Sequence, residues 1–140
     1  MSSARETDLD PRTYIGLSFP LRADNNNDFA LTKNSLQQAV HNLKNLLLTH
    51  PGERVGQPTF GSRLRALCFE PDNTELPQRI EAEVIRSVNQ WLGYININSV
   101  DVLTDAVNKN KIITRITFST SLNPETIQQI EVDASTSTDY

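Results

Sequence analysis

The sequence predicts an α+β fold, in which an N-terminal edge strand is followed by three helices and a C-terminal antiparallel β-hairpin. Two observations carry this prediction. Apolar residues recur every three or four positions through the middle of the chain, as in helices, and every two positions near both ends, as in strands. Breakers at Pro51-Gly52, Pro71 and Gly93 separate these segments. An additional strand after the hairpin is expected only if a partner pairs with it.

The first strand and the first helix occupy residues 15–48. Pro20 has no N–H to donate to a ladder, so the strand should lie at an edge or pair on one side only. We expect it to bury one face, formed by Ile15, Leu17, Phe19 and Leu21. A helix is predicted over residues 33–48, with Thr32 as its cap. Its apolar stripe consists of Leu36, Val40, Leu43 and Leu47.

Two further helices are predicted before residue 93. The first is short and covers residues 62–69, and the second tolerates Pro77 in its first turn and ends at Gly93. Asp72, Asn73 and Thr74 are the candidate caps of the second helix. Its apolar stripe is Ile80, Val84, Val88 and Trp91, widened by Ile85 and Leu92. Glu83 and Arg86, three residues apart, are interpreted as ordinary surface support.

The sequence of the C-terminal third predicts β-strands. Ile95 and Ile97 stand at odd positions, whereas Val100 and Val102 stand at even positions, so a regular strand would place the two pairs on opposite faces. This change indicates a bulge or break near residues 98–99. A turn is predicted at residues 108–110, and one face of the next strand is formed by Ile112, Thr114, Ile116 and Phe118. A last candidate strand covers residues 127–132. It has few apolar residues and little reason to form unless something pairs with it.

Composition bounds the function. The chain has 140 residues, of which 37% are hydrophobic, and this is enough for one modest domain. We divide it into a polar arm at residues 1–12, a single domain at 13–122, and a strand with a polar tail at 123–140. No apolar stretch suggests a membrane span or a cleaved secretory signal. A net charge of −4 disfavours generic binding to a phosphate backbone. One cysteine, Cys68, fits a reducing compartment.

Residue types that carry chemistry are few. His41 and His50 are nine positions apart, so a helix would place them on roughly opposite faces, and no zinc-binding spacing is present. We therefore expect no metal and no cofactor. Cys68 lies among apolar residues and is interpreted as a small core residue rather than a nucleophile. Arg63 and Arg65 have acidic neighbours, which favours a solvated or ion-paired face over a nucleic-acid site.

Glu53 and Glu70 are the carboxylate pair that a glycosidase would need. Both stand beside a connection rich in proline and glycine, where a concave surface could form. The alternative is that they cap backbone amides or pair with arginine. A catalytic role would require an open cleft with a second carboxylate about 5–10 Å away.

Three blocks occur in order between residues 51 and 71: Pro51-Gly52-Glu53-Arg54, Pro58-Thr59-Phe60-Gly61 and Phe69-Glu70-Pro71. In this order and spacing they resemble the signature of the contractile-tail baseplate wedge family. That family includes the sheath-initiator subunit of T-even phages and the related type VI secretion subunit. The similarity runs from about Tyr14 to Phe118.

The physical interpretation of these blocks needs no enzyme. The two glycines permit backbone angles closed to other residues, and Phe60 is an apolar anchor for the loop. Arg54 is expected to bridge loop carbonyls or a carboxylate and so to hold Glu53 or Glu70 in place. The predicted structural-motif residues are Gly52, Glu53, Arg54, Pro58, Phe60, Gly61, Glu70 and Pro71.

The resemblance implies a structural virion subunit, in the inner ring of the baseplate, on which the first ring of tail-sheath subunits assembles. Wedge proteins, the sheath protein and tube or hub proteins are the implied partners, without nucleic acid or membrane. The implied location is the tail baseplate, with the host cytoplasm during assembly. We expect sheath arms to pair with the last strand, at Ile127, Ile130 and Val132.

The family typically carries Trp-Glu-Pro-Arg-Ile after its third helix, and its charged residues are implicated in contact with the wedge's helical bundle. Here the stretch is Trp91-Leu92-Gly93-Tyr94-Ile95. The resemblance therefore implies that any bundle contact uses Trp91, Tyr94 and Ile95 through apolar and aromatic surfaces.

Alternative functions stay open from the sequence. The nearest is a baseplate subunit of a type VI or other contractile injection system. A different class is a regulatory module, because a bacterial anti-adaptor that masks a protease adaptor uses the same fold. A lysozyme-like glycosidase is a third, since some relatives have been labelled lysozymes.

Overall fold

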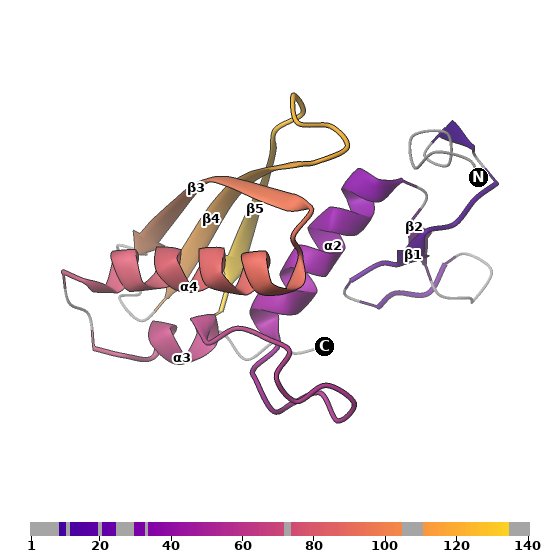
Figure 1. The fold of residues 1–140 in the computed structure, drawn as a ribbon. Helices are drawn as coiled ribbons and strands as arrows, with labels where there is room; N and C mark the ends of the chain where they lie inside the picture. Colours follow the sequence, from indigo (N-terminus) through magenta and orange to yellow (C-terminus); the bar gives the residue numbers. More distant parts are fainter. Residues whose placement is uncertain are drawn as a thin grey trace. The chain divides into compact units, whose positions relative to one another are not determined.

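The computed structural model describes residues 9–10, 12–19, 21–24, 30–32, 34–71, 74–104 and 111–134. The chain divides into two compact units, Met1–Asn45 and Leu46–Tyr140, and each is considered by itself. Its helices and strands confirm the predicted α+β class (Figure 1). In chain order they are β1 (Gly16–Leu17), β2 (Leu31–Thr32), α2 (Ser35–Leu48), α3 (Leu64–Cys68), α4 (Leu76–Trp91), β3 (Ile95–Thr104), β4 (Ile112–Thr120) and β5 (Gln128–Asp133).

The C-terminal unit is built on a three-stranded antiparallel sheet of order β3-β4-β5. The central strand β4 buries alternate residues over 112–118, and these are the four predicted ones: Ile112, Thr114, Ile116 and Phe118. Ser119 and Thr120 at its end are buried as well. Ile116 lies at its middle, opposite Val100 of β3 and Ile130 of β5. The period of two therefore identified the core strand correctly.

The predicted phase slip in β3 is confirmed as a register shift between Ile97 and Ser99. Before it, Ile97 pairs with Phe118, and after it, Val100 pairs with Ile116. The bulge thus keeps the apolar residues of both halves of β3 on the side of the buried β4 residues.

The last candidate strand forms within the chain, because β5 pairs along its length with β4. Ile130 and Val132 are 5% and 3% exposed. The segment was expected to form only if something pairs with it, and β4 of the same chain supplies that ladder while the sheet interior supplies the burial. The turn predicted at residues 108–110 lies outside the described residues.

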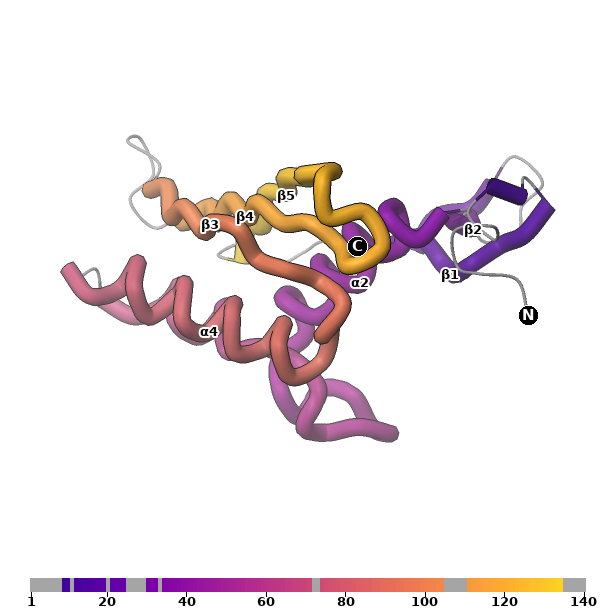
Figure 2. The backbone as a smooth tube through the Cα atoms, turned by 45° about the horizontal axis from the view of Figure 1, so that its top comes forward, coloured from indigo at the N-terminus to yellow at the C-terminus, as the bar shows by residue number. Residues whose placement is uncertain are grey.

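One face of the sheet is covered by α4, which crosses the strands as a separate layer (Figures 1 and 2). Ile80, Val84 and Val88 are fully buried on it, as predicted, whereas Ile85 is 37% exposed and does not widen the stripe. Pro77 lies in the first turn. The boundary residue is Glu75, which makes no side-chain cap, so the cap predicted at Thr74 is wrong; residues 72–73 lie outside the described residues.

Helix α2 spans the boundary between the two units and ends at Leu48, as predicted. It begins later than expected. Asn34 Oδ1 accepts the Gln37 N–H at 2.7 Å, so Asn34 is the cap, and Thr32 belongs to β2 instead. Its buried residues are Ala39, Leu43, Leu46 and Leu47, while Leu36 and Val40 are half-buried.

The N-terminal unit contains the two-residue strands β1 and β2, paired antiparallel. Among the described residues β1 pairs on one side only, as the edge-strand prediction required. The expected buried face is wrong: Ile15, Leu17 and Leu21 are 38%, 47% and 60% exposed. A ribbon of this size buries little of its own surface. Within the described residues, no helix has the length and hydropathy of a membrane crossing.

Candidate functional site

The connection between α2 and α3, residues 49–63, contains two of the three sequence blocks and is called the motif loop. It leaves and re-enters the fold at one point, where the Ser62 N–H donates to the Thr49 carbonyl at 2.8 Å. A second closure joins the Gly52 N–H to the Pro58 carbonyl at 2.7 Å. Residues 52–59 are exposed between these ties. The motif loop is therefore a projecting surface element with a fixed base.

Two glycines make the base of the motif loop sterically feasible. Gly61 has a φ of +132°, and a Cβ there would lie 2.4 Å from the Thr49 carbonyl oxygen. Gly52 has a φ of +99° but open space around it. Both conformations are ones that other residues rarely adopt, as the sequence predicts. At Gly61 the close approach of the backbone adds a second requirement.

An aromatic stack anchors the motif loop to the last turn of α4. Phe60 is 8% exposed, and its ring meets Trp91 edge to face, with centroids 5.3 Å apart. The Arg54 guanidinium lies over the Phe60 ring, 4.2 Å from its centroid. Phe60 thus has the anchoring role expected of it. Arg54 differs from the expectation, because it stacks on Phe60 instead of holding a carboxylate.

Glu53 and Glu70 each have a local partner. Glu53 Oε2 accepts a hydrogen bond from the His50 N–H at 3.1 Å. The Glu70 carboxylate accepts hydrogen bonds from both terminal nitrogens of Arg79, one of them at 3.2 Å. These contacts are the backbone cap and arginine pair that formed the alternative to catalysis. Pro71, exposed, follows directly after Glu70.

Glu83 joins α4 to the start of α3, a contact that the sequence did not reveal. Its Oε1 accepts the Arg63 N–H at 2.8 Å, Arg86 Nη2 at 2.7 Å and Ser87 Oγ at 3.2 Å. Burial raises the pKa of Glu83, but the hydrogen bonds from Arg86, Arg63 and Ser87 together lower it below its ordinary value of 4.5. Spacing within α4 predicted only the Arg86 contact, since Arg63 is twenty residues away.

The single cysteine is inert. Burial, followed by the negative charge of Asp133, raises the pKa of the Cys68 thiol to about 11. Cys68 is 6% exposed at the inward face of α3. It is therefore a core residue, which is the interpretation that the sequence favoured.

The residues suggested for bundle contact have different environments. Ile95 is 2% exposed inside β3, and Trp91 is half-buried against Phe60. Tyr94 is 40% exposed in the turn between α4 and β3. Its carbonyl accepts the N–H and the hydroxyl of Ser121, at 2.9 and 3.1 Å, which fixes the turn. Only Tyr94 and the accessible part of Trp91 present side chains to a partner.

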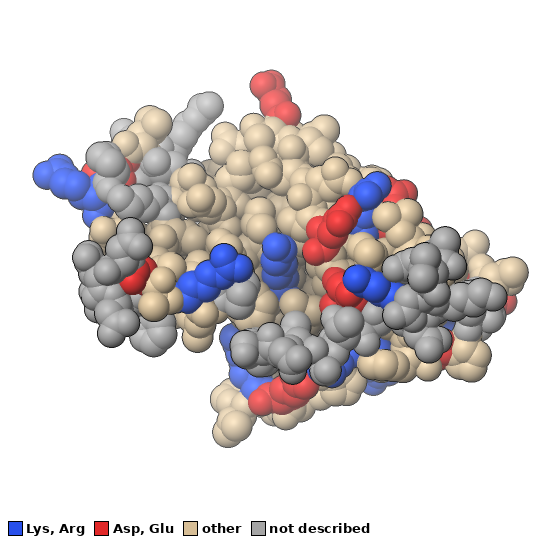
Figure 3. All heavy atoms as spheres, turned by 180° about the vertical axis from the view of Figure 1, so that it is seen from behind, with Lys and Arg blue, Asp and Glu red and all other residues tan. Residues whose placement is uncertain are grey.

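The residues suggested for strand pairing also differ in exposure. Ile127 precedes β5 and is 59% exposed, whereas Ile130 and Val132 point into the sheet interior. Next to them, Arg115 Nη2 contacts Glu131 Oε1 at 2.8 Å, and Lys111 contacts Asp133 at 3.4 Å. Figure 3 shows acidic and basic side chains close together on the face opposite to that of Figure 1. A partner strand would thus meet β5 mainly through its backbone.

The N-terminal unit contains a pocket of about 500 Å³. Its lining has no Asp, Glu, Lys or Arg, and the Nδ1 atom of His41 lies 3.0 Å from the Phe19 nitrogen. Its lining is Gly16, Leu17, Ser18, Phe19, Leu21, Gln38, His41, Asn42 and Asn45. Across the described residues, no cluster of three or more His, Cys, Asp or Glu side chains is arranged to hold a metal ion.

The motif loop, α3, α4 and most of the sheet lie within the match to a family model. The model described as baseplate wedge protein gp25 matches residues 33–125. The chain belongs to this family. It is accordingly a structural baseplate protein of a contractile tail or tail-like particle, and other baseplate proteins are its partners.

Solved structures share the fold. A Geobacter sulfurreducens protein that carries the name tail lysozyme superposes with a TM-score of 0.64 at 23% identity, covering 74% of this chain and 94% of that one. A chain of the anti-feeding prophage baseplate gives 0.66 at 22%, covering 75% and 83%. A chain of the postcontracted pyocin R2 baseplate gives 0.55 at 23%, covering 71% and 97%. No protein with curated annotation matches the chain significantly.

The gp25 family membership bears on the open alternatives. A baseplate wedge role is structural, which agrees with the local partners of Glu53 and Glu70. The anti-feeding prophage and pyocin R2 baseplate chains share this fold.

Proposed function

We propose that this baseplate wedge protein lies in the inner ring of the baseplate and starts assembly of the tail sheath. In this proposal a sheath subunit adds one strand to the sheet of the C-terminal unit. The observation that carries it is the edge strand β5, which pairs with β4 on one side and, among the described residues, with no strand on the other.

The two edges of the sheet are not equivalent. β3 carries the bulge between Ile97 and Ser99, and bulges interrupt the regular row of backbone groups that an incoming strand needs. β5 has six residues in unbroken register with β4. The uninterrupted edge of β5 is therefore the better acceptor for a sheath arm.

Affinity at β5 would come from backbone hydrogen bonds. Ile130 and Val132 are already buried, so their role is to hold β5 in place, and Ile127 remains exposed at its entrance. Because β5 completes the core, its removal would unfold the sheet instead of testing the contact. The same unit offers Tyr94 and the accessible part of Trp91 as the contact to the wedge's helical bundle.

Cysteine pairing between β5 and sheath arms tests the proposal. Gln129 and Glu131 are exposed on β5, so Gln129→Cys and Glu131→Cys leave the core intact. Each variant is assembled with sheath subunits that carry single cysteines along the arm, and a mild oxidant then removes two electrons and two protons from each thiol pair. Disulfides should form at alternate positions of the sheath arm, since paired strands bring Cα atoms within about 5.5 Å. Asn98→Cys, exposed on the bulged β3, is the matched control and should not cross-link. Equal cross-linking from Asn98→Cys, or none from β5, would overturn the proposal.

A further inference from the structure

A surface at the junction of α3 and α4 combines arginines with an exposed aromatic ring. On α3 and its ends it consists of Arg63, Ala66 and Phe69, which recur every three residues and are all exposed. Phe69 retains helical angles, with φ −94° and ψ −3°, so the three side chains share one side. Arg79 and Arg86 of α4 complete this set, which is called the arginine–phenylalanine surface.

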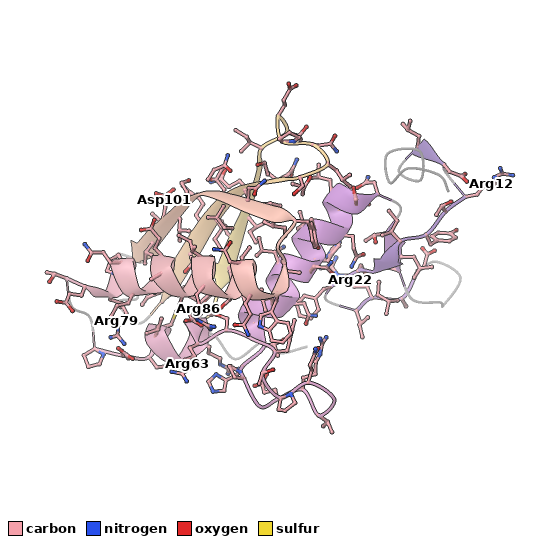
Figure 4. All side chains as sticks on the ribbon, in the orientation of Figure 1. Arg12, Arg22, Arg63, Arg79, Arg86 and Asp101 are labelled. Atoms are coloured by element: carbon pink, nitrogen blue, oxygen red, sulfur yellow. The ribbon has the colours of Figure 1, made fainter. Side chains whose placement is uncertain are left out.

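Charge on this surface is unbalanced. The carboxylate of Glu70 is held by Arg79, and that of Glu83 is held by Arg86 and by the Arg63 N–H. The Arg63 guanidinium itself has no ion pair within the described part of the chain. Figure 4 shows Arg63, Arg79 and Arg86 on the side of α4 where α3 lies. Counted over the described residues, the surface therefore has a surplus cation, although the chain as a whole carries −4.

Phe69 is the unexpected member. The sequence places it beside Cys68 at the end of an apolar helix, yet it is 66% exposed, while Leu64, Leu67 and Cys68 face inward. A large aromatic ring next to arginine has the composition of interface hot spots, where these residue types are enriched.

We propose that the arginine–phenylalanine surface docks an acidic segment of a neighbouring baseplate protein, with one apolar side chain of that segment against Phe69. Charge complementarity selects this occupant: Arg63 has no ion pair with any described residue, and Phe69 offers apolar area on the same side of α3. Nucleic acid fits less well, because a phosphate backbone needs several free cations and, among the described residues of this surface, Arg79 and Arg86 are already held by carboxylates. The surface shares no residue with β5, so its test is independent of the test of sheath pairing.

Site-specific photo-cross-linking in assembled baseplates identifies the occupant. Ala66 is exposed between Arg63 and Phe69, so a benzophenone amino acid at position 66 reports on what covers the surface. Mass spectrometry should place the cross-link in a segment rich in Asp and Glu of another baseplate protein. The same probe at Asn89, exposed on α4 outside the surface, is the control. Cross-links to a basic or uncharged segment, to the sheath or to nucleic acid, or none at all, would contradict the proposal.

Two substitutions then test the energetics. Phe69→Ala and Arg63→Glu should each reduce incorporation into baseplates by about tenfold or more, as expected for hot-spot residues. Matched controls are Leu122→Ala, which removes an exposed apolar side chain elsewhere, and Arg22→Glu, which reverses an exposed arginine in the N-terminal unit. Arg63→Ala provides a variant without new repulsion of Glu83. Normal incorporation of both Phe69→Ala and Arg63→Ala, with unchanged melting temperatures, would overturn the proposal.

Discussion

The sheet of the C-terminal unit and the β1–β2 ribbon of the N-terminal unit arise from the same sequence pattern but differ in structure. Both segments alternate apolar and polar residues. In β4 the alternation gives a nine-residue strand with Ile116 and Phe118 fully buried. In β1 it gives two paired residues, and Leu17 is 47% exposed. A period of two therefore specifies which residues share a face, but burial requires a second layer.

Polar contacts hold the ribbon where apolar burial does not. The Ile15 N–H donates to the Thr32 carbonyl at 2.9 Å, and the Thr32 hydroxyl donates to the Gly16 carbonyl at 3.2 Å. A Cβ at Gly16 would lie 2.5 Å from Gln38 Oε1, so α2 and β1 approach closely there. Contacts of this kind contribute about 1 kcal/mol each, whereas a buried aliphatic side chain contributes roughly 1.5–3 kcal/mol.

Truncation of one aliphatic side chain in each region gives the largest expected contrast. Ile116→Ala should lower the free energy of unfolding by about 3–4 kcal/mol, because it leaves a cavity in the middle of the sheet. Leu17→Ala should lower it by less than about 1 kcal/mol. Urea denaturation followed by Trp91 fluorescence and by far-UV circular dichroism measures both. Comparable losses would show that the ribbon's apolar face is buried in solution.

The sequence predicted most of the C-terminal unit for physical reasons that operate locally. The β4 face, the β3 bulge and the end of α2 depend on alternation, on parity and on Pro51-Gly52, all of which are visible over a few residues. The missed features depend on pairing across long separations. β5 forms because β4 is its neighbour, and Thr32 is removed from the helix cap because it pairs with Gly16.

The motif loop shows that exposure alone does not make a region tolerant. Gly61→Ala should lower the free energy of unfolding by about 2 kcal/mol or more, because the residue has a positive φ and its Cβ would meet a backbone carbonyl. Gly56→Ala is the matched control in the same loop: it has open space and no positive φ, and the change should stay within about 0.5 kcal/mol. Equal effects would mean that the base of the loop is not fixed.

The roles of site residues were predictable where backbone conformation determines them. They were less predictable where side-chain partners from distant parts of the chain determine them. Gly61 and Phe60 follow from the spacing of proline, glycine and aromatic residues. Arg54 does not, because a guanidinium can equally pair with a carboxylate or stack on a ring, and only the fold brings Phe60 beneath it. The contact between Glu83 and the Arg63 N–H could not be predicted for the same reason, since Arg63 stands at the start of α3 and Glu83 lies on α4.

Acid titration gives the smallest expected effect and compares one carboxylate from each unit. The pKa of Glu83 is lowered in the folded state, so its stabilisation is complete above pH 4.5 and is lost as the pH falls below that value. The pKa of Asp10 is also lowered, by the Arg12 N–H and the Thr13 hydroxyl, but its side chain is 41% exposed and both partners lie within three residues of it. Glu83→Gln should therefore flatten the loss of stability between pH 5 and about pH 3, whereas Asp10→Asn should flatten it less. Denaturant midpoints measured across this range decide between them. An equal change in both variants would place the acid-sensitive contacts outside the α3–α4 junction.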